Sequence, residues 1–160
     1  MTEAPIPLTE TPEYHEELVA AFRGSADALI DACNAVADPF KPIEQDGWNT
    51  HQIAVHVRDV EANVYGMRIR RSIDEDNPLF PNFDGDAWMA EHYDPQEPLS
   101  KILADFLDDA GELAALLRAQ PNSAWSRPSR HETQGNFVLQ TWFERALAHI
   151  REHLETVKKA

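Results

Sequence analysis

Cysteine is nearly absent from this chain of 160 residues, in which Cys33 is the single example. One thiol cannot form an internal disulfide, and it cannot supply the thiolate cluster that structural zinc sites usually contain. Cys33 lies on an apolar helical stripe, a position typical of a small buried hydrophobe. The sequence therefore excludes a disulfide scaffold and indicates a reducing compartment.

Basic residues are scarce and long apolar runs are lacking. Lysine and arginine number 14 against 28 acidic residues, so the formal net charge is -14 and a phosphate backbone would be repelled. There is no run of 18 apolar residues, and Met1–Glu10 lacks the charged and apolar regions of a signal peptide. We expect a cytoplasmic protein with no membrane or nucleic-acid partner, built as one domain over residues 1–160 with a loose lead-in at residues 1–10.

Helical periodicity dominates what the sequence contains. Apolar residues recur every three or four positions in four segments, and no strand pattern separates them. The predicted helices run from Thr11 to about Ala37, from Thr50 to about Arg71, from Pro98 to just before Pro121, and from a cap at Asn136 to about Val157. The sequence therefore predicts an all-α fold, a four-helix bundle.

Two segments between these helices lose the helical pattern. Ser72 to Glu97 is too long for a simple turn, and we expect it to be a lid or crossover between the second and third helices, with a short helix over residues 86–92. Residues 121–135 contain His131. That histidine is either a proton carrier or, as is commoner for loop histidines, a hydrogen-bonded structural residue.

Three histidines are candidate metal ligands. His149 and His153 are four residues apart and share one face of the last helix, on a largely apolar, inward stripe. His56 faces inward on the second helix. A buried imidazole needs hydrogen-bond partners or a metal, and three nitrogen ligands with an open position are typical of catalytic zinc or nickel sites. If the second and fourth helices are neighbours, His56, His149 and His153 can bind one divalent cation.

Asp59 and Glu61 follow His56 within two turns. We expect both to belong to a solvated acidic face. The alternative is that one of them is an outer hydrogen-bond partner of a ligating imidazole.

Several short motifs in this order resemble the DinB/YfiT-like four-helix-bundle metalloproteins. The resemblance spans roughly Trp48 to Val157. The motifs that carry it are Trp48-Asn49-Thr50-His51-Gln52-Ile53-Ala54-Val55-His56 with Asp59 and Glu61, then Trp88, Trp125-Ser126-Arg127 with His131 and Gly135, and His149-Ile150-Arg151-Glu152-His153-Leu154. The resemblance implies that His56, His149 and His153 match the family's divalent-metal triad and that a long crossover joins the second and third helices.

The resemblance narrows the activity less than the fold. Similar proteins include thiol transferases that use bacillithiol, mycothiol or glutathione, a mycothiol-dependent isomerase, and candidate hydrolases. We therefore predict a metal-dependent enzyme acting on a small molecule, with a low-molecular-weight-thiol S-transferase as the leading interpretation. A metal-dependent hydrolase and a non-enzymatic, metal-binding or homodimeric bundle are the alternatives, and no catalytic base is assigned.

Overall fold

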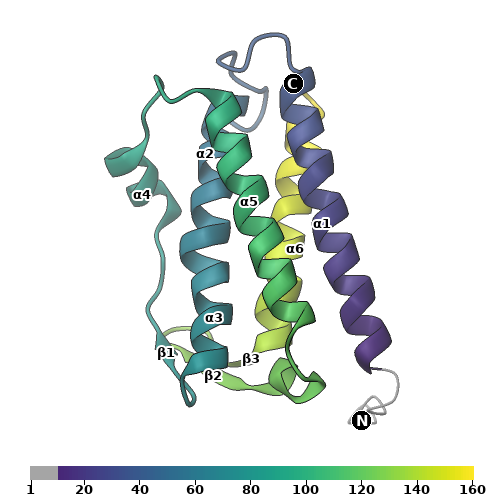
Figure 1. Cartoon of the computed structure of the whole chain (residues 1–160). Helices are drawn as coiled ribbons and strands as arrows, with labels where there is room; N and C mark the ends of the chain where they lie inside the picture. The colour runs from purple at the N-terminus through teal and green to yellow at the C-terminus, as the bar shows by residue number, and fades with distance from the viewer. Residues whose placement is uncertain (1–10) are drawn as a thin grey trace.

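Four long helical columns lie side by side in the computed structural model, which describes residues 11–160 (Figure 1). Three are single helices: α1 (Thr11–Ala35), α5 (Leu99–Arg118) and α6 (Leu139–Val157). The fourth joins α2 (Thr50–Val60), the π-helical turn η1 (Glu61–Gly66) and α3 (Met67–Asp74) end to end. The predicted four-helix bundle is confirmed. The expected loose lead-in lies outside the described residues.

The α1 column is diagonal to the α2–α3 column, and α5 is diagonal to α6. Both α1 and α2 pack against α5 and α6. Residues 75–98 run back along the bundle, so that α5 points in the same direction as α2 (Figure 1). This segment contains β1 (Leu79–Phe80) and α4 (Gly85–His92). The long crossover and its short helix are therefore confirmed, and α2 and α6 are neighbours.

An apolar core runs the length of the bundle. Each helix buries most of the apolar stripe that its sequence predicts, and each large side chain that is fully buried contributes about 1.5–3 kcal/mol. The largest of these side chains are Trp142, Phe22, Phe80, Phe106, Phe143 and Leu29. Within residues 11–160, none of the helices combines the length and apolarity that crossing a membrane requires.

A small sheet covers one end of the bundle, which the sequence did not predict. β2 (Pro128–His131) pairs with β3 (Gly135–Val138) in an antiparallel hairpin and with β1 in parallel. Asn136 lies opposite Arg130 in this hairpin, so its predicted role as the cap of the last helix was wrong, and α6 begins at Leu139. Strands of two to four residues are too short to show an alternating pattern.

The start and middle of the second column are set by particular residues. Asn49 and Gln52 form the predicted capping box at the start of α2. In η1, a Cβ added to Gly66 would lie only 2.8 Å from the carbonyl oxygen of Glu61, so glycine lets the widened turn close. The residue that this turn adds changes which positions face inward. Arg68 is buried, and the predicted inward residue Met67 is only half-buried.

Candidate metal centre

The three predicted ligands come together between α2 and α6. The nearest ligand atoms of His56, His149 and His153 all lie within 4.8 Å of one another. The Nε2 atoms of His56 and His149 are 3.1 Å apart, and the ring of His153 is centred 4.8 Å from that of His56 and 4.6 Å from that of His149. The second and fourth predicted helices are thus neighbours, as binding of one cation by all three histidines requires.

Burial keeps these imidazoles neutral. Burial, with the neighbouring His153 as the next cause, lowers the pKa of His56 to about 4 and that of His149 to about 3. The pKa of His153 is also lowered by burial. All three side chains therefore offer unprotonated nitrogens near neutral pH, as metal binding requires.

Glu61 fixes the orientation of one candidate ligand. Its Oε1 lies 3.1 Å from Nδ1 of His149, and its side chain is only 5% exposed. This contact turns Nε2 of His149 toward His56. Burial raises the pKa of Glu61 well above its usual value. The prediction of a solvated residue was wrong for Glu61, and the alternative, an outer partner of a candidate ligand, describes its position.

The donor set fits a divalent cation. Nitrogens that bind one tetrahedral zinc ion are about 3.4 Å apart, close to the 3.1 Å between the Nε2 atoms of His56 and His149. Without a cation, the two facing Nε2 atoms can share only one hydrogen, and Nδ1 of His56 has no hydrogen-bond partner within residues 11–160. Buried polar atoms are rarely left in this state. Metal binding by the triad itself stays a prediction.

A cavity of about 260 Å³ adjoins the triad. His56 and His149 lie in its wall, together with residues of η1, α3, the crossover and the β2–β3 hairpin: Val60, Val64, Tyr65, Arg68, Asn82, Phe83, Gly85, His131 and Gln134. Among the residues described, this wall contains no carboxylate. Neither Tyr65 nor Arg68 was predicted from the sequence. Arg68 faces inward because of the π turn, which has no periodic signal.

His131 is one of the cavity residues that the sequence did identify. Its Nδ1 accepts hydrogen bonds from the backbone N–H groups of Thr133 and Gln134, at 3.1 and 3.2 Å. Burial, with Arg68 as the next cause, lowers its pKa. The ring is therefore neutral, with its hydrogen on Nε2, which has no acceptor among the residues described.

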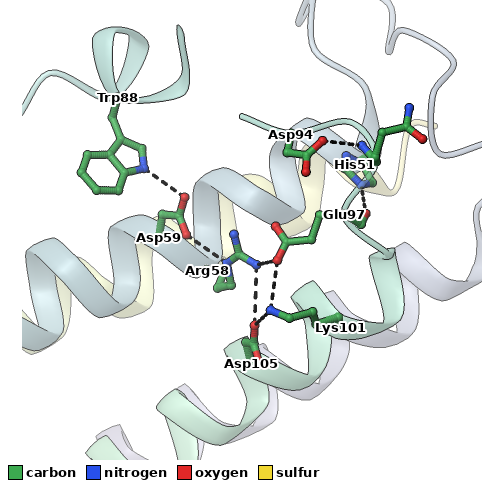
Figure 2. Close-up of polar contacts among 9 residues, drawn as sticks. His51, Arg58, Asp59, Trp88, Asp94, Glu97, Lys101 and Asp105 are labelled. Carbon is green, nitrogen blue, oxygen red and sulfur yellow. Dashed lines mark hydrogen bonds and ion pairs between the residues drawn. The ribbon is translucent and has the colours of Figure 1, made fainter. Parts of the chain in front are cut away.

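The crossover is fastened to α2 by a polar network around Arg58 (Figure 2). Arg58 donates to Asp59 and to Glu97, at 2.9 and 2.6 Å, and Asp59 also accepts from the indole N–H of Trp88 at 2.9 Å. Asp59 thus ties α4 to α2 and forms no hydrogen bond with a candidate ligand. Held in this way, Gly85 packs against the imidazole of His56, where a Cβ would lie 3.5 Å from Cε1. The side chain of Asp59 is only 14% exposed, so the prediction of a solvated residue was wrong for Asp59 as well.

Trp125 and Arg127, also singled out in the sequence, lie away from the triad. Trp125 stacks on His15 with ring centres 3.9 Å apart. Arg127 donates to the backbone carbonyl of Ser72 at 2.6 Å and to that of Glu75 at 2.9 Å, at the end of α3. Both contacts hold the end of the bundle together and add nothing to the donor set.

Comparisons with known proteins agree with this architecture. Among solved structures, YfiT from Bacillus subtilis matches with a TM-score of 0.83 and 22% identity, over 98% of this chain and 88% of that one. YfiT is described as a probable metal-dependent hydrolase with an unusual four-helix bundle topology. No curated protein matches the chain. The family model of the DinB superfamily matches residues 16–157, so the chain belongs to the DinB superfamily.

Proposed function

We propose that this chain is a divalent-metal-dependent enzyme that acts on a small molecule in the cavity beside His56, His149 and His153. The observation that carries the proposal is the convergence of three neutral imidazoles, two of which, His56 and His149, line that cavity. Zinc and nickel are the metals that such nitrogen ligands favour. YfiT, described as a probable metal-dependent hydrolase, supports metal dependence in a chain of the same fold.

Thiol transfer suits the cavity better than hydrolysis. A bound divalent cation supplies positive charge that lowers the pKa of a thiol or a water molecule. The described cavity wall contains no carboxylate, and His131 presents a hydrogen-bond donor, so no residue there is placed to accept a proton from water. A thiol, with an ordinary pKa near 8.5, depends far less on such a base. We therefore propose a low-molecular-weight-thiol S-transferase that uses bacillithiol, mycothiol or glutathione.

The transfer conserves charge and atoms in a simple way. The thiol sulfur forms a bond to an electrophilic carbon, the leaving group departs with its bonding electrons, and the thiol proton passes to solvent. In this scheme His56, His149 and His153 hold the cation, and Glu61 keeps His149 oriented. Hydrolysis of an ester or amide in the same cavity is the second candidate, favoured by the description of YfiT.

Metal content and a spectroscopic probe test the proposal. Protein purified without nickel resin is analysed for metal as wild type, His56→Ala, His149→Ala and His153→Ala, with His92→Ala as a control because His92 is exposed on α4. Cobalt-loaded protein is then titrated with bacillithiol, mycothiol and glutathione in turn. We expect one thiol to produce a sulfur-to-metal charge-transfer band, and the same thiol to be conjugated to chlorodinitrobenzene.

The outcomes separate the candidates. Undiminished metal content in all three triad variants would remove the proposed site. A thiol-induced band with conjugation that is lost in His153→Ala supports the transferase. Turnover of simple esters or amides without any thiol-induced band supports the hydrolase, and metal binding without either reaction supports a non-enzymatic bundle.

A further inference from the structure

Arg68 is a buried cation without an anionic partner. Its side chain comes from α3, is only 5% exposed, and stacks over the ring of Trp142 with the guanidinium carbon 4.7 Å from the ring centre. One terminal nitrogen donates to the carbonyl of Pro81 at 3.2 Å, and Nε has no partner within residues 11–160. Nor does any carboxylate in that range form an ion pair with it. Arginine is rarely buried unless it is paired.

His131 adds a second unpaired donor to the same cavity. It is 4% exposed, and its Nδ1 is already occupied by two backbone N–H groups. The remaining Nε2–H has no acceptor among the residues described. Arg68 and His131 both line the cavity that His56 and His149 also line.

The charge of the cavity wall is opposite to that of the whole chain. Although the formal net charge is -14, Arg68 is the one permanently charged side chain in the described wall, and the other polar groups there are neutral. Unpaired donors in a buried place, with no acceptor opposite, indicate a ligand that supplies acceptors. A carboxylate does so with two oxygens, and the planar guanidinium matches that pair of atoms.

We propose that the substrate is a small carboxylic acid whose carboxylate binds to Arg68 and to Nε2–H of His131, with its reacting end toward the histidine triad. The orientation rests on the proposed function, but the carboxylate site itself does not need the metal. One guanidinium and one neutral imidazole compensate a single negative charge, so a monoanion matches the site better than a phosphate dianion. Arg68 and His131 are thereby binding residues that set which molecules the cavity accepts.

Binding to metal-free protein tests the carboxylate site by itself. Benzoate and propionate are titrated by calorimetry and by NMR of the histidine side chains, and their amides serve as uncharged probes of the same shape. We expect the carboxylates to bind and to shift the resonances of His131, and the amides to bind at least about tenfold more weakly, since a charged hydrogen bond contributes about 1.5–3 kcal/mol. This comparison uses wild-type protein and needs no variant to fold.

Variants locate the binding. Arg68→Gln and His131→Gln are each expected to weaken carboxylate binding at least about tenfold. Arg71→Gln is the matched control, because Arg71 also comes from α3 and also lies over an aromatic ring, 5.0 Å from the centre of Phe80, but is paired with Glu75 outside the cavity. Circular dichroism checks that each variant is folded.

Different results would overturn the two proposals. Equal binding of acid and amide, or preferential binding of inorganic phosphate, would overturn the carboxylate site even if the triad binds metal. If carboxylates bind in a manner that depends on Arg68 but the triad takes up no metal, the carboxylate site is supported and the proposed metal-dependent function is refuted. In cobalt-loaded protein, a mercaptoalkanoate is expected to perturb the spectrum at lower concentration than its amide, and this preference should disappear in Arg68→Gln.

Discussion

Replacing Glu61 by glutamine tests how the protein prepares His149 to bind a metal. Glu61→Gln keeps the size and shape of the side chain but removes the carboxylate, whose Oε1 lies 3.1 Å from Nδ1 of His149. With Nε2 of His149 directed toward His56, Nδ1–H is the donor in this contact. A carboxylate partner of this kind fixes the ring orientation and increases the basicity of the ligating nitrogen. The amide should do both less well.

The expected size of the effect follows from that role. Loss of such an outer partner costs about 10–100-fold in metal affinity, or about 1.4–2.7 kcal/mol. In the metal-free protein, by contrast, the same substitution should not lower the stability of the fold. Because burial raises the folded-state pKa of Glu61, its contribution to stability is present at low pH and is lost as the pH rises. Near neutral pH, metal-free Glu61→Gln should therefore be at least as stable as wild type.

Two measurements check this pair of effects. Zinc affinity is determined by competition with a chromophoric chelator, and the stability of metal-free protein is determined by urea unfolding. Glu152→Gln is the matched control, because Glu152 is adjacent to His153 in sequence but is exposed. Unchanged zinc affinity in Glu61→Gln, or an equal loss in Glu152→Gln, would refute the argument that Glu61 acts through its contact with His149.

Three further perturbations have expected outcomes. EDTA should lower the melting temperature but leave the helical circular dichroism signal unchanged, because the core around Trp142 is independent of the triad. Loss of that signal would show that the metal is structural. Metal-free protein should lose stability as the pH falls from 6.5 toward 4, because the lowered pKa values of His56 and His149 mean that the unfolded chain takes up protons before the folded chain does. The midpoint of urea unfolding measures this stability, and a midpoint that does not change with pH would contradict the expectation. Gly66→Ala should lower the free energy of unfolding by about 1–3 kcal/mol, because the added Cβ clashes with the carbonyl oxygen of Glu61. Gly24→Ala is the control, since a Cβ there meets nothing within 4 Å, and equal stability of the two variants would count against a strained π turn.

Patterns that repeat along the chain could be predicted from the sequence. In each long helix the apolar positions repeat over several turns. The four-residue spacing of His149 and His153 places them on one helical face whatever the fold. The apolar period of α2 likewise placed His56 on the inward face of that helix. The length of the crossover also followed, because residues 75–98 lack the period for far longer than a turn requires.

Features that depend on a single residue or on a distant contact could not be predicted. The π turn at Glu61–Gly66 has no periodic signal, and it decides that Arg68 faces inward. The β2–β3 hairpin is too short to show strand alternation, so His131 was found by its residue type and not by its position. The fastening of the crossover needs Arg58 to meet Glu97, 39 residues away, and local sequence contains no information on that pairing.

The charge of the chain gives the proposed carboxylate site a particular behaviour. A net charge of -14 repels an anion at long range, but salt screens this repulsion over about 8 Å at physiological ionic strength. Close to Arg68 the opposite field dominates, because the guanidinium is buried and poorly screened. Added salt should therefore weaken the long-range barrier more than the contact itself. The acidic surface would then slow the entry of a carboxylate without greatly changing how long it stays, and the selectivity of the cavity would depend on Arg68 and His131.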